Sequence, residues 1–452
     1  MYRIVQSHPS PQKIRRSLPL AALDPYLSDS DVEALCRRVG HRWRRRKLSP
    51  GLMVRSMVHR GLHPDHSIAG MLAELAASWD PDELVPTDSA WCQARSRLPE
   101  TVLTELIARR ARQCRRRFGQ PYRWHGRWVF RIDGSTVSMP DEPALVEAFG
   151  YTNTRHGRSR FPVARVTFIE LAGANVVWDY RLGPYTGSEE AQLYEMWPSL
   201  PRGSINLLDR KFCSFYILAK ARRQGRDVIT PLHQRRDPQK LITQGRPLGP
   251  QEWLVPLNLA PALRRRFNDP TLPKVLWVRL IRVSRRRGSK QKVRWLVTTL
   301  LDPKKYPRQE IAHLYRRRWE VETRIGELKT TLQMNVLRGK SPEAVRREVA
   351  SIILGHNLVW MLIHEAAAVS DTEPHDISFA GAVKTTLSFS PMLRQCSGHR
   401  RAGLYQRMLM HIARQRNHHP ANRVEPRLLK RETARFAYLR EPRWKARLKC
   451  LS

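Results

Sequence analysis

The spacing of apolar residues divides the chain into regions of different secondary structure. From about residue 18 to 118, apolar residues recur at helical spacing. This pattern predicts helices over Asp29 to Val39, Ser49 to Arg60, Ile68 to Ala77 and Thr101 to Phe118. Pro64, Pro81 and Pro86 separate them. We therefore expect residues 1–120 to form a compact helical domain with basic residues on its outer faces.

The pattern changes to that of strands at Trp128. The run WVFRID predicts a strand that ends at Asp133 and Gly134. Val163 to Leu171 and Asn175 to Leu182 predict two more strands, joined as a hairpin by an Ala-Gly-Ala turn.

Two further strands follow, alternating with helices. The run SINLLD predicts a fourth strand, which ends at Asp209. The run VITPL, from Val228, predicts a fifth strand. Helices are predicted from Ser188 to Trp197 and from Phe212 to Arg223. The order strand, strand, strand, helix, strand, helix, strand is that of a ribonuclease-H-like mixed sheet. We therefore expect an α/β fold for residues 121–233 and 294–370.

Residues 234–293 interrupt this core with proline, glycine and basic residues, and are too long for a simple loop. KVLWVRLIRVS and KVRWLVTTL flank a basic turn, which predicts a β-rich insertion subdomain. Helical spacing resumes at Pro307 and again from Pro342 to about Val369. Residues 371–452 are weakly patterned and increasingly basic, and we expect at most partial order there.

No segment favours a membrane. The N-terminal sequence lacks the apolar stretch of a secretory signal. The longest apolar stretch, Ser351 to Val369, contains His356, Asn357, His364 and Glu365. These residues are expensive in lipid and ordinary in a core helix, so we expect a buried helix and a cytoplasmic protein.

The charge points to nucleic acid. Lys and Arg total 81 against 40 Asp and Glu, a net charge of +41 that is spread along the chain. Any one basic cluster can be a solvated face, but self-repulsion on this scale costs stability unless phosphates neutralise it. DNA is the expected partner.

Cysteine and histidine add no predicted site. The six cysteines lie far apart without a CxxC pair and are expected to be reduced thiols. His418 and His419 lack the spacing of metal ligands on a helix.

The segment Leu314 to Leu332, LYRRRWEVETRIGELKTTL, carries the candidate chemistry. On a regular helix, at about 100° per residue, Tyr315, Arg318, Glu322 and Lys329 share one narrow stripe beside an apolar stripe. Glu320 and Glu327 fall on the solvent side. Glu322 is therefore the predicted carboxylate ligand.

Hydrolysis of a phosphodiester needs an activated water and a stabilised leaving oxygen, which two Mg²⁺ ions about 4 Å apart supply. Such hard cations take carboxylate oxygens. Because Asp133 and Asp209 both end predicted strands, we expect Asp133, Asp209 and Glu322 to be catalytic and to bind two Mg²⁺ ions, for which Mn²⁺ can substitute. Arg318 and Lys329 are expected to bind DNA phosphates, and Tyr315 to donate a hydrogen bond to one.

Together these motifs resemble the DDE transposases of the insertion sequence four family. The resemblance rests on Asp133-Gly134-Ser135, Asp209-Arg210-Lys211-Phe212 and the Tyr, Arg, Glu and Lys spacing of residues 315–329. SPGLMVRSMVHRGL and DSAWCQARSRLP resemble that family's end-binding domain, and NRVEPRLLKRETARFAYL its basic tail. The resemblance implies metal-dependent strand cleavage and strand transfer at the ends of an insertion sequence. It implies binding of the terminal inverted repeats and of target DNA, by a homodimer when two ends are synapsed, in a bacterial, nucleoid-associated protein.

Three questions stay open at this stage. Trp295 resembles a tryptophan that stacks on a flipped base in some relatives, but a cross-strand core aromatic is the favoured interpretation. Trp277 has the same two interpretations. The alternatives to a transposase are an inactive relative that acts as a DNA-binding repressor and a ribonuclease-H-like DNA nuclease that does not join strands.

Overall fold

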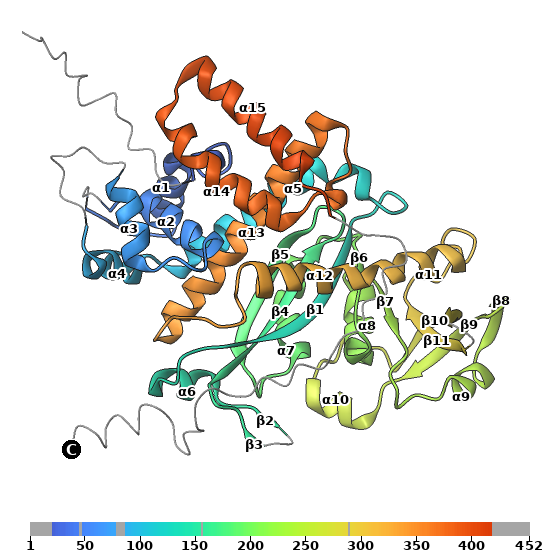
Figure 1. Ribbon diagram of the computed structural model, residues 1–452. Helices are drawn as coiled ribbons and strands as arrows, with labels where there is room; N and C mark the ends of the chain where they lie inside the picture. Colours follow the sequence, from blue (N-terminus) through green and yellow to red (C-terminus); the bar gives the residue numbers. More distant parts are fainter. Residues whose placement is uncertain (1–19, 45–47, 78–85, 155–156, 288–289, 418–452) are drawn as a thin grey trace, which may run out of the picture. The chain divides into compact units, whose positions relative to one another are not determined.

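The computed structural model describes residues 20–44, 48–77, 86–154, 157–287 and 290–417 (Figure 1). These residues divide into two compact units. The first combines the described residues up to Leu106 with residues 331–333 and those from Glu343 onward. The second comprises residues 107–330 and 334–342. The four domain ranges expected from the sequence stay a prediction.

The helices of the first unit come from two parts of the chain, one that precedes the strands of the sheet in the sequence and one that follows them. They are α1 (Asp29–Arg38), α2 (Pro50–Leu62), α3 (Ile68–Ala76), α4 (Asp88–Arg97), the first turns of α5 (Glu100–Phe118), α13 (Pro342–Ser370), α14 (Phe379–Gln395) and α15 (Gly398–Arg414). Ser28, Ser49 and Thr87 cap α1, α2 and α4 by accepting a hydrogen bond from the backbone amide three residues on. The sequence pattern misses α4, since Trp91 is its one buried residue.

The C-terminal region is more ordered than the sequence predicts. α14 and α15 are regular helices, and they bury Phe379, Leu393, Met408 and Ile412. The expectation of partial order is wrong for the described residues, because these apolar side chains find tertiary partners that a weak local pattern does not reveal. The segment NRVEPRLLKRETARFAYL, with His418 and His419, lies outside the described residues.

The long apolar helix α13 is a core helix, as the sequence predicts. Its length and composition would allow it to cross a membrane, but 83% of its most apolar window is buried inside the protein. His356 and Asn357 are fully buried within it. Glu365 accepts a hydrogen bond from the Tyr405 hydroxyl of α15 at 2.6 Å, so its charge is partnered within the first unit.

The second unit is organised around one nine-stranded sheet with the order β5-β4-β1-β6-β7-β11-β10-β9-β8. Its strands are β1 (Val129–Ser138), β4 (Val163–Leu171), β5 (Val176–Pro184), β6 (Ile205–Leu207), β7 (Asp227–Pro231), β8 (Arg246–Gly249), β9 (Glu252–Asn258), β10 (Val275–Arg287) and β11 (Lys290–Thr298). A separate pair joins β2 (Asn153–Thr154) to β3 (Gly157–Arg158). The helices of this unit, besides the end of α5, are α6 (Pro143–Phe149), α7 (Glu189–Met196), α8 (Phe215–Arg223), α9 (Pro238–Thr243), α10 (Pro261–Phe267), α11 (Arg308–Arg316) and α12 (Glu320–Gly326).

The first five strands of this sheet confirm the ribonuclease-H-like prediction. β1 lies in their centre, antiparallel to β4 and parallel to β6, and β6 is in turn parallel to β7. β4 and β5 form the predicted hairpin. α11 and α12 lie across the strands of this sheet, where α12 contacts β1 and α11 contacts β7 (Figure 1).

The insertion is strand-rich, as predicted, but its strands do not form a sheet of their own. β11 pairs antiparallel with β7, and β10, β9 and β8 follow outward, so the insertion extends the central sheet. The physical reason is that β7 would otherwise expose an edge of unpaired backbone groups. The last core strand, β7, and the strands of the insertion are therefore parts of one continuous sheet.

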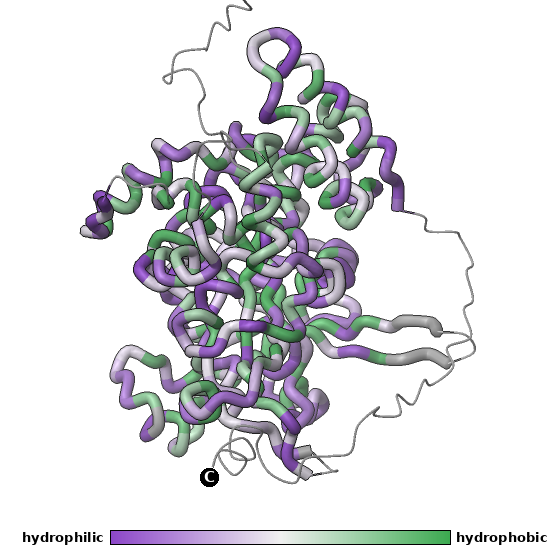
Figure 2. The backbone as a smooth tube through the Cα atoms, turned by 60° about the vertical axis from the view of Figure 1, so that its left-hand side comes forward, coloured by the Kyte–Doolittle hydropathy of each residue, from purple (hydrophilic) through white to green (hydrophobic). Residues whose placement is uncertain are grey.

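Apolar residues from the strands and from α11 form the core beneath the carboxyl ends of β1 and β6. Ile205, Leu207 and Ile229 pack with Ile311 and Leu314 there. Along the tube in Figure 2, hydrophobic and hydrophilic residues alternate in short stretches, as expected for elements with one buried face. This core fixes the position of α11 and of the helical turns that follow it.

Candidate functional site

Asp133 lies within β1 rather than at its end. The strand continues to Ser138, because residues beyond Asp133 still pair with β4, so the predicted end at Asp133 and Gly134 is wrong. Pairing with the parallel strand β6, however, ends at Arg131. Asp133 therefore stands just past the carboxyl edge of the parallel part of the sheet, where loops and helices bring other side chains close.

Gly134 is required by a close approach. Its backbone amide donates to Oδ1 of Asp133 at 2.9 Å. A Cβ atom at Gly134 would lie 2.7 Å from the Glu189 carboxyl carbon, well inside contact distance. Any side chain here would displace Glu189, whose carboxylate pairs with Arg165 and lies 3.9 Å from the Lys211 ammonium nitrogen.

Asp209 follows β6, and its backbone is held by hydrogen bonds on both sides. Its carbonyl accepts from the Thr230 hydroxyl at 3.0 Å. The preceding residue, Leu208, donates its amide to the Ile229 carbonyl at 3.0 Å. The Leu208 carbonyl accepts a hydrogen bond from the Tyr315 hydroxyl at 3.1 Å. The position of Asp209 thus depends on β7 and on α11.

Arg318 brings two of the predicted carboxylates to one place. Its Nη1 donates to Oδ2 of Asp133 at 2.9 Å, and its Nη2 donates to Oε1 of Glu322 at 2.9 Å. The guanidinium is buried, whereas the Asp133 and Glu322 side chains keep 19% and 36% of their surface exposed. The two carboxylates therefore share a cation and remain open to solvent.

The charge of Asp209 acts on Asp133 and on Tyr315. Burial raises the pKa of Asp133, the Arg318 guanidinium opposes this rise, and the charge of Asp209 adds to it. Burial also raises the pKa of Tyr315, and Asp209 acts on it in the same direction. Burial acts to lower the pKa of Arg318, but Tyr315, Asp133 and Glu322 outweigh it and raise that pKa.

Asp133 and Glu322 meet at the Arg318 guanidinium, and Asp209 is linked to them through the effect of its charge on Asp133. Among the described residues, a cluster of three His, Cys, Asp or Glu ligand atoms all within 4.8 Å of one another occurs at His59, His66 and Glu74, in the other unit. The chemistry of the donor set still suits a hard divalent cation, since it supplies carboxylate oxygens from two strands and one helix. The Arg318 contacts show that this place attracts positive charge.

The helix that carries these residues is less regular than the sequence predicts. α11 continues through a 3-10 turn (Arg317–Trp319) into α12 and then into a π-helical turn (Glu327–Thr331). Tyr315 donates to the Leu208 carbonyl just after β6, and Arg318 donates to Asp133 within β1 and to Glu322. Lys329 lies further along, in the π-helical turn, and is partly buried.

Glu327 is largely buried, contrary to the prediction, whereas the Glu320 side chain stays 40% exposed but is paired with arginines. Glu320 accepts from Arg131, which is fully buried in β1, and from Arg317 at 2.9 Å. Glu327 pairs with Arg324 at 3.0 Å, with both side chains largely buried. Arg131 was the signal in the sequence that could have revealed the pairing of Glu320, because an arginine inside an apolar strand requires carboxylate partners. Glu170 is its other partner, at 2.7 Å.

Two tryptophans differ in exposure. Trp295 is partly buried on β11, and its ring centroid lies 5.7 Å from that of Trp253 and 6.0 Å from the Arg282 guanidinium carbon. Trp319 directly follows Arg318 and is 65% exposed. Sequence reasoning missed Trp319, although it falls on the polar side of the same helical segment. An exposed ring beside the carboxylates offers a stacking surface for a base.

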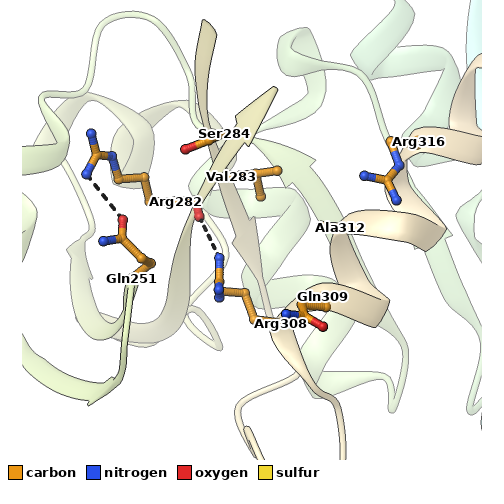
Figure 3. A pocket seen from close by; sticks show the side chains of 8 residues that line it. All are labelled: Gln251, Arg282, Val283, Ser284, Arg308, Gln309, Ala312 and Arg316. Atoms are coloured by element: carbon orange, nitrogen blue, oxygen red, sulfur yellow. Dashed lines mark hydrogen bonds between the residues drawn. The ribbon is translucent and has the colours of Figure 1, made fainter. Parts of the chain in front are cut away.

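A cationic cavity of about 630 Å³ lies between β10 and α11. Arg282, Arg308 and Arg316 line it with Gln251, Ser284 and Gln309 (Figure 3). Arg282 donates to the Gln251 side chain at 3.2 Å, and Arg308 donates to the Arg282 carbonyl at 3.5 Å. Three guanidinium groups around one hollow suit the binding of phosphate oxygens.

The chain is similar to known proteins in sequence and in fold. A family model described as a transposase DDE domain matches residues 124–358. The chain is 26% identical, over 369 residues, to the transposase InsG for insertion sequence element IS4 of Escherichia coli strain K12, covering 80% of this chain and 81% of that protein. It is also similar to a piggyBac transposase solved as a synaptic complex with hairpin DNA, with 10% identity and a TM-score of 0.45 over 91% of this chain and 88% of the other.

Proposed function

This chain belongs to the transposase DDE domain family, and from that premise we propose that Asp133, Asp209 and Glu322 are its catalytic carboxylates. The protein is a transposase of an insertion sequence, an enzyme that cleaves and transfers DNA strands. The observation that most supports the three residues is the Arg318 bridge. One buried guanidinium joins Asp133 of β1 to Glu322 of α12, while the charge of Asp209 acts on Asp133.

The proposed metal ligands are the same three carboxylates, with two Mg²⁺ ions as the cofactor and Mn²⁺ able to replace them. Such ions, when bound, supply an activated water and stabilise the leaving oxygen. The carboxylates come from rigid elements, since Asp133 lies in β1 and Asp209 is held by the Tyr315 and Thr230 hydrogen bonds around it. Arg318 offsets the charge of two of them in the protein without metal.

Arg318 and Lys329 are proposed to bind DNA phosphates. The guanidinium of Arg318 has five N–H donors and can contact a phosphate while it keeps a carboxylate. Lys329 would act as a mobile point charge from the π-helical turn. Tyr315 is proposed to position Asp209, because its hydroxyl donates to the Leu208 carbonyl and its side chain is buried. A phosphate contact by Tyr315 would require this hydroxyl to leave the carbonyl.

The DNA partner is double-stranded, comprising the terminal inverted repeats and the target DNA. The net charge of +41 and the arginine-lined cavity between β10 and α11 support extensive phosphate contacts. Trp319 is the proposed base-stacking residue beside the carboxylates, with Trp295 as the candidate taken from the sequence. Two ends held together imply a homodimer on DNA, acting in the cytoplasm at the bacterial nucleoid.

The experiment that tests this proposal compares two aspartates of the same unit. Full-length protein is incubated with Mg²⁺ and DNA carrying the inverted repeats that flank the coding sequence. We expect cleavage and joining by wild type, and end binding without cleavage by Asp133→Asn. The control, Asp141→Asn, removes the charge of another aspartate of this unit, keeps an amide oxygen that can accept from the Tyr151 hydroxyl, and should still cleave.

The other results separate the alternatives. Equal cleavage by Asp133→Asn and wild type would show that the active site lies elsewhere. End binding by wild type without cleavage, in Mg²⁺ and in Mn²⁺, would indicate a repressor. Cleavage without joining would indicate a nuclease.

A further inference from the structure

We propose that His59, His66 and Glu74 form a second metal site, for Zn²⁺, in the helical unit. Their ligand atoms all lie within 4.8 Å of one another. His59 comes from the last turn of α2, His66 from the turn that follows, and Glu74 from α3. This site is independent of the catalytic carboxylates, and its proposal does not rest on their role.

The distances fit ligands around an ion. The His59 Nε2 lies 3.2 Å from one Glu74 oxygen, and the His66 Nδ1 lies 3.2 Å from the other. Two ligands at 2.0–2.1 Å from a tetrahedral zinc are about 3.3 Å apart. A direct charge-assisted hydrogen bond would be shorter, about 2.7–2.9 Å. Small movements of the three side chains would therefore admit the ion.

The donor chemistry selects zinc over magnesium. Two imidazoles and one carboxylate suit a borderline ion such as Zn²⁺, whereas Mg²⁺ prefers oxygen ligands alone.

His63 is the candidate for a fourth ligand. It ends α2, and its ring stacks on that of His66 with 3.6 Å between centroids. Its ring nitrogens are not among the three ligand atoms that cluster within 4.8 Å, so its side chain would have to turn toward the ion to bind it.

The site would have a structural role. It would join α2 to α3 across the turn that contains Pro64, where α3 is a short helix that buries Met71 and Leu72. A site filled by protein ligands leaves no open position for chemistry and contributes to folding stability. We infer that zinc holds α3 against α2 in this unit.

The test uses full-length protein with Asp133→Asn and Glu322→Gln, so that the catalytic carboxylates cannot account for the binding. Zn²⁺ is titrated by calorimetry, and Co²⁺ replaces it as a spectroscopic probe. We expect one ion per chain, the absorption bands of tetrahedral Co²⁺, and a higher melting temperature with Zn²⁺ than with Mg²⁺. The absence of stoichiometric binding would overturn the proposal.

Single-residue variants identify the ligands. His66→Gln and Glu74→Gln change partly exposed side chains and should still fold. Each should lose at least about tenfold in Zn²⁺ affinity. His125→Gln is the matched control, because His125 also contacts a glutamate, Glu310, at 2.7 Å, in the other unit. Unchanged affinity in the first two variants, or an equal loss in His125→Gln, would contradict the assignment.

Discussion

Arg318 donates from Nη1 to Oδ2 of Asp133 at 2.9 Å, although 185 positions separate the two residues in the chain. The contact ties the helical segment after β11 to the central strand β1. Because the same guanidinium also donates to Glu322, the two carboxylates share one cation. Several properties of the site depend on this arrangement.

Arg318→Gln should destabilise the protein most when metal is absent. Removing one partner of a mostly buried pair leaves Asp133 uncompensated, at a cost of about 2 kcal/mol. Mg²⁺ bound by the carboxylates should reduce this loss, which denaturant unfolding with and without Mg²⁺ measures. Arg181→Gln is the control, because the Arg181–Asp179 pair is more exposed and should contribute at most about 1 kcal/mol. An equal loss with and without Mg²⁺ would contradict the prediction.

Tyr315→Phe should impair cleavage beyond its effect on stability. The change removes the hydrogen bond to the Leu208 carbonyl, at a cost of about 1 kcal/mol, and lets the neighbouring Asp209 move. Tyr405→Phe removes a similar hydroxyl, bonded to Glu365 in the helical unit. Both variants should unfold somewhat more easily, but only Tyr315→Phe should cleave DNA more slowly. Parallel effects of the two variants on the cleavage rate would exclude a positioning role for Tyr315.

The neighbouring glutamates of α12 should respond differently to loss of charge. Glu322→Gln should fold normally and lower the rate of strand cleavage by at least about a thousandfold, as expected for a lost metal ligand. Glu320→Gln should retain cleavage and lose about 1–2 kcal/mol of stability, because the buried Arg131 loses a partner. Cleavage assays and unfolding curves on both variants test this prediction. The reverse result would make Glu320 the catalytic residue.

Acid should reveal the contribution of Glu320 to stability. Burial acts to raise the pKa of this carboxylate, but the charges of Arg131 and Arg317 outweigh it and lower the pKa below the ordinary 4.5. A lowered pKa means that the stabilisation is complete above the ordinary value and is lost as the pH falls through the lower one. The stability difference between wild type and Glu320→Gln should therefore be constant from neutral pH down to about 4.5 and shrink below it. A difference that grows with acid would refute the pairing.

Trp319→Ala and Trp295→Ala should separate DNA contact from packing. Trp319 is largely exposed, so its loss should leave the melting temperature unchanged and weaken cleavage of end DNA. Trp295 lies against Trp253 and Arg282, so its loss should lower the melting temperature. Normal cleavage by Trp319→Ala would remove it as a stacking residue.

The periodicity of the sequence was sufficient for the main strands and helices of the sheet region and for proposing three carboxylates, which stay a prediction. Strand and helix patterns are local, so the hairpin of β4 and β5, the strand before Asp209 and the core helix α13 follow from neighbouring residues alone. Helical spacing is also the basis on which Glu322 was preferred to Glu320, and this choice stays a prediction.

Only the tertiary structure decided which side chains share a partner. Asp133 proved to lie inside a strand because β4 pairs beyond it, and Glu320 is ion-paired because the buried Arg131 donates to it. The insertion joined the central sheet because β7 offered an edge to β11. His59 and Glu74 met because α3 folds back beside α2. Such contacts depend on where the chain returns in space, and local periodicity carries no record of that path.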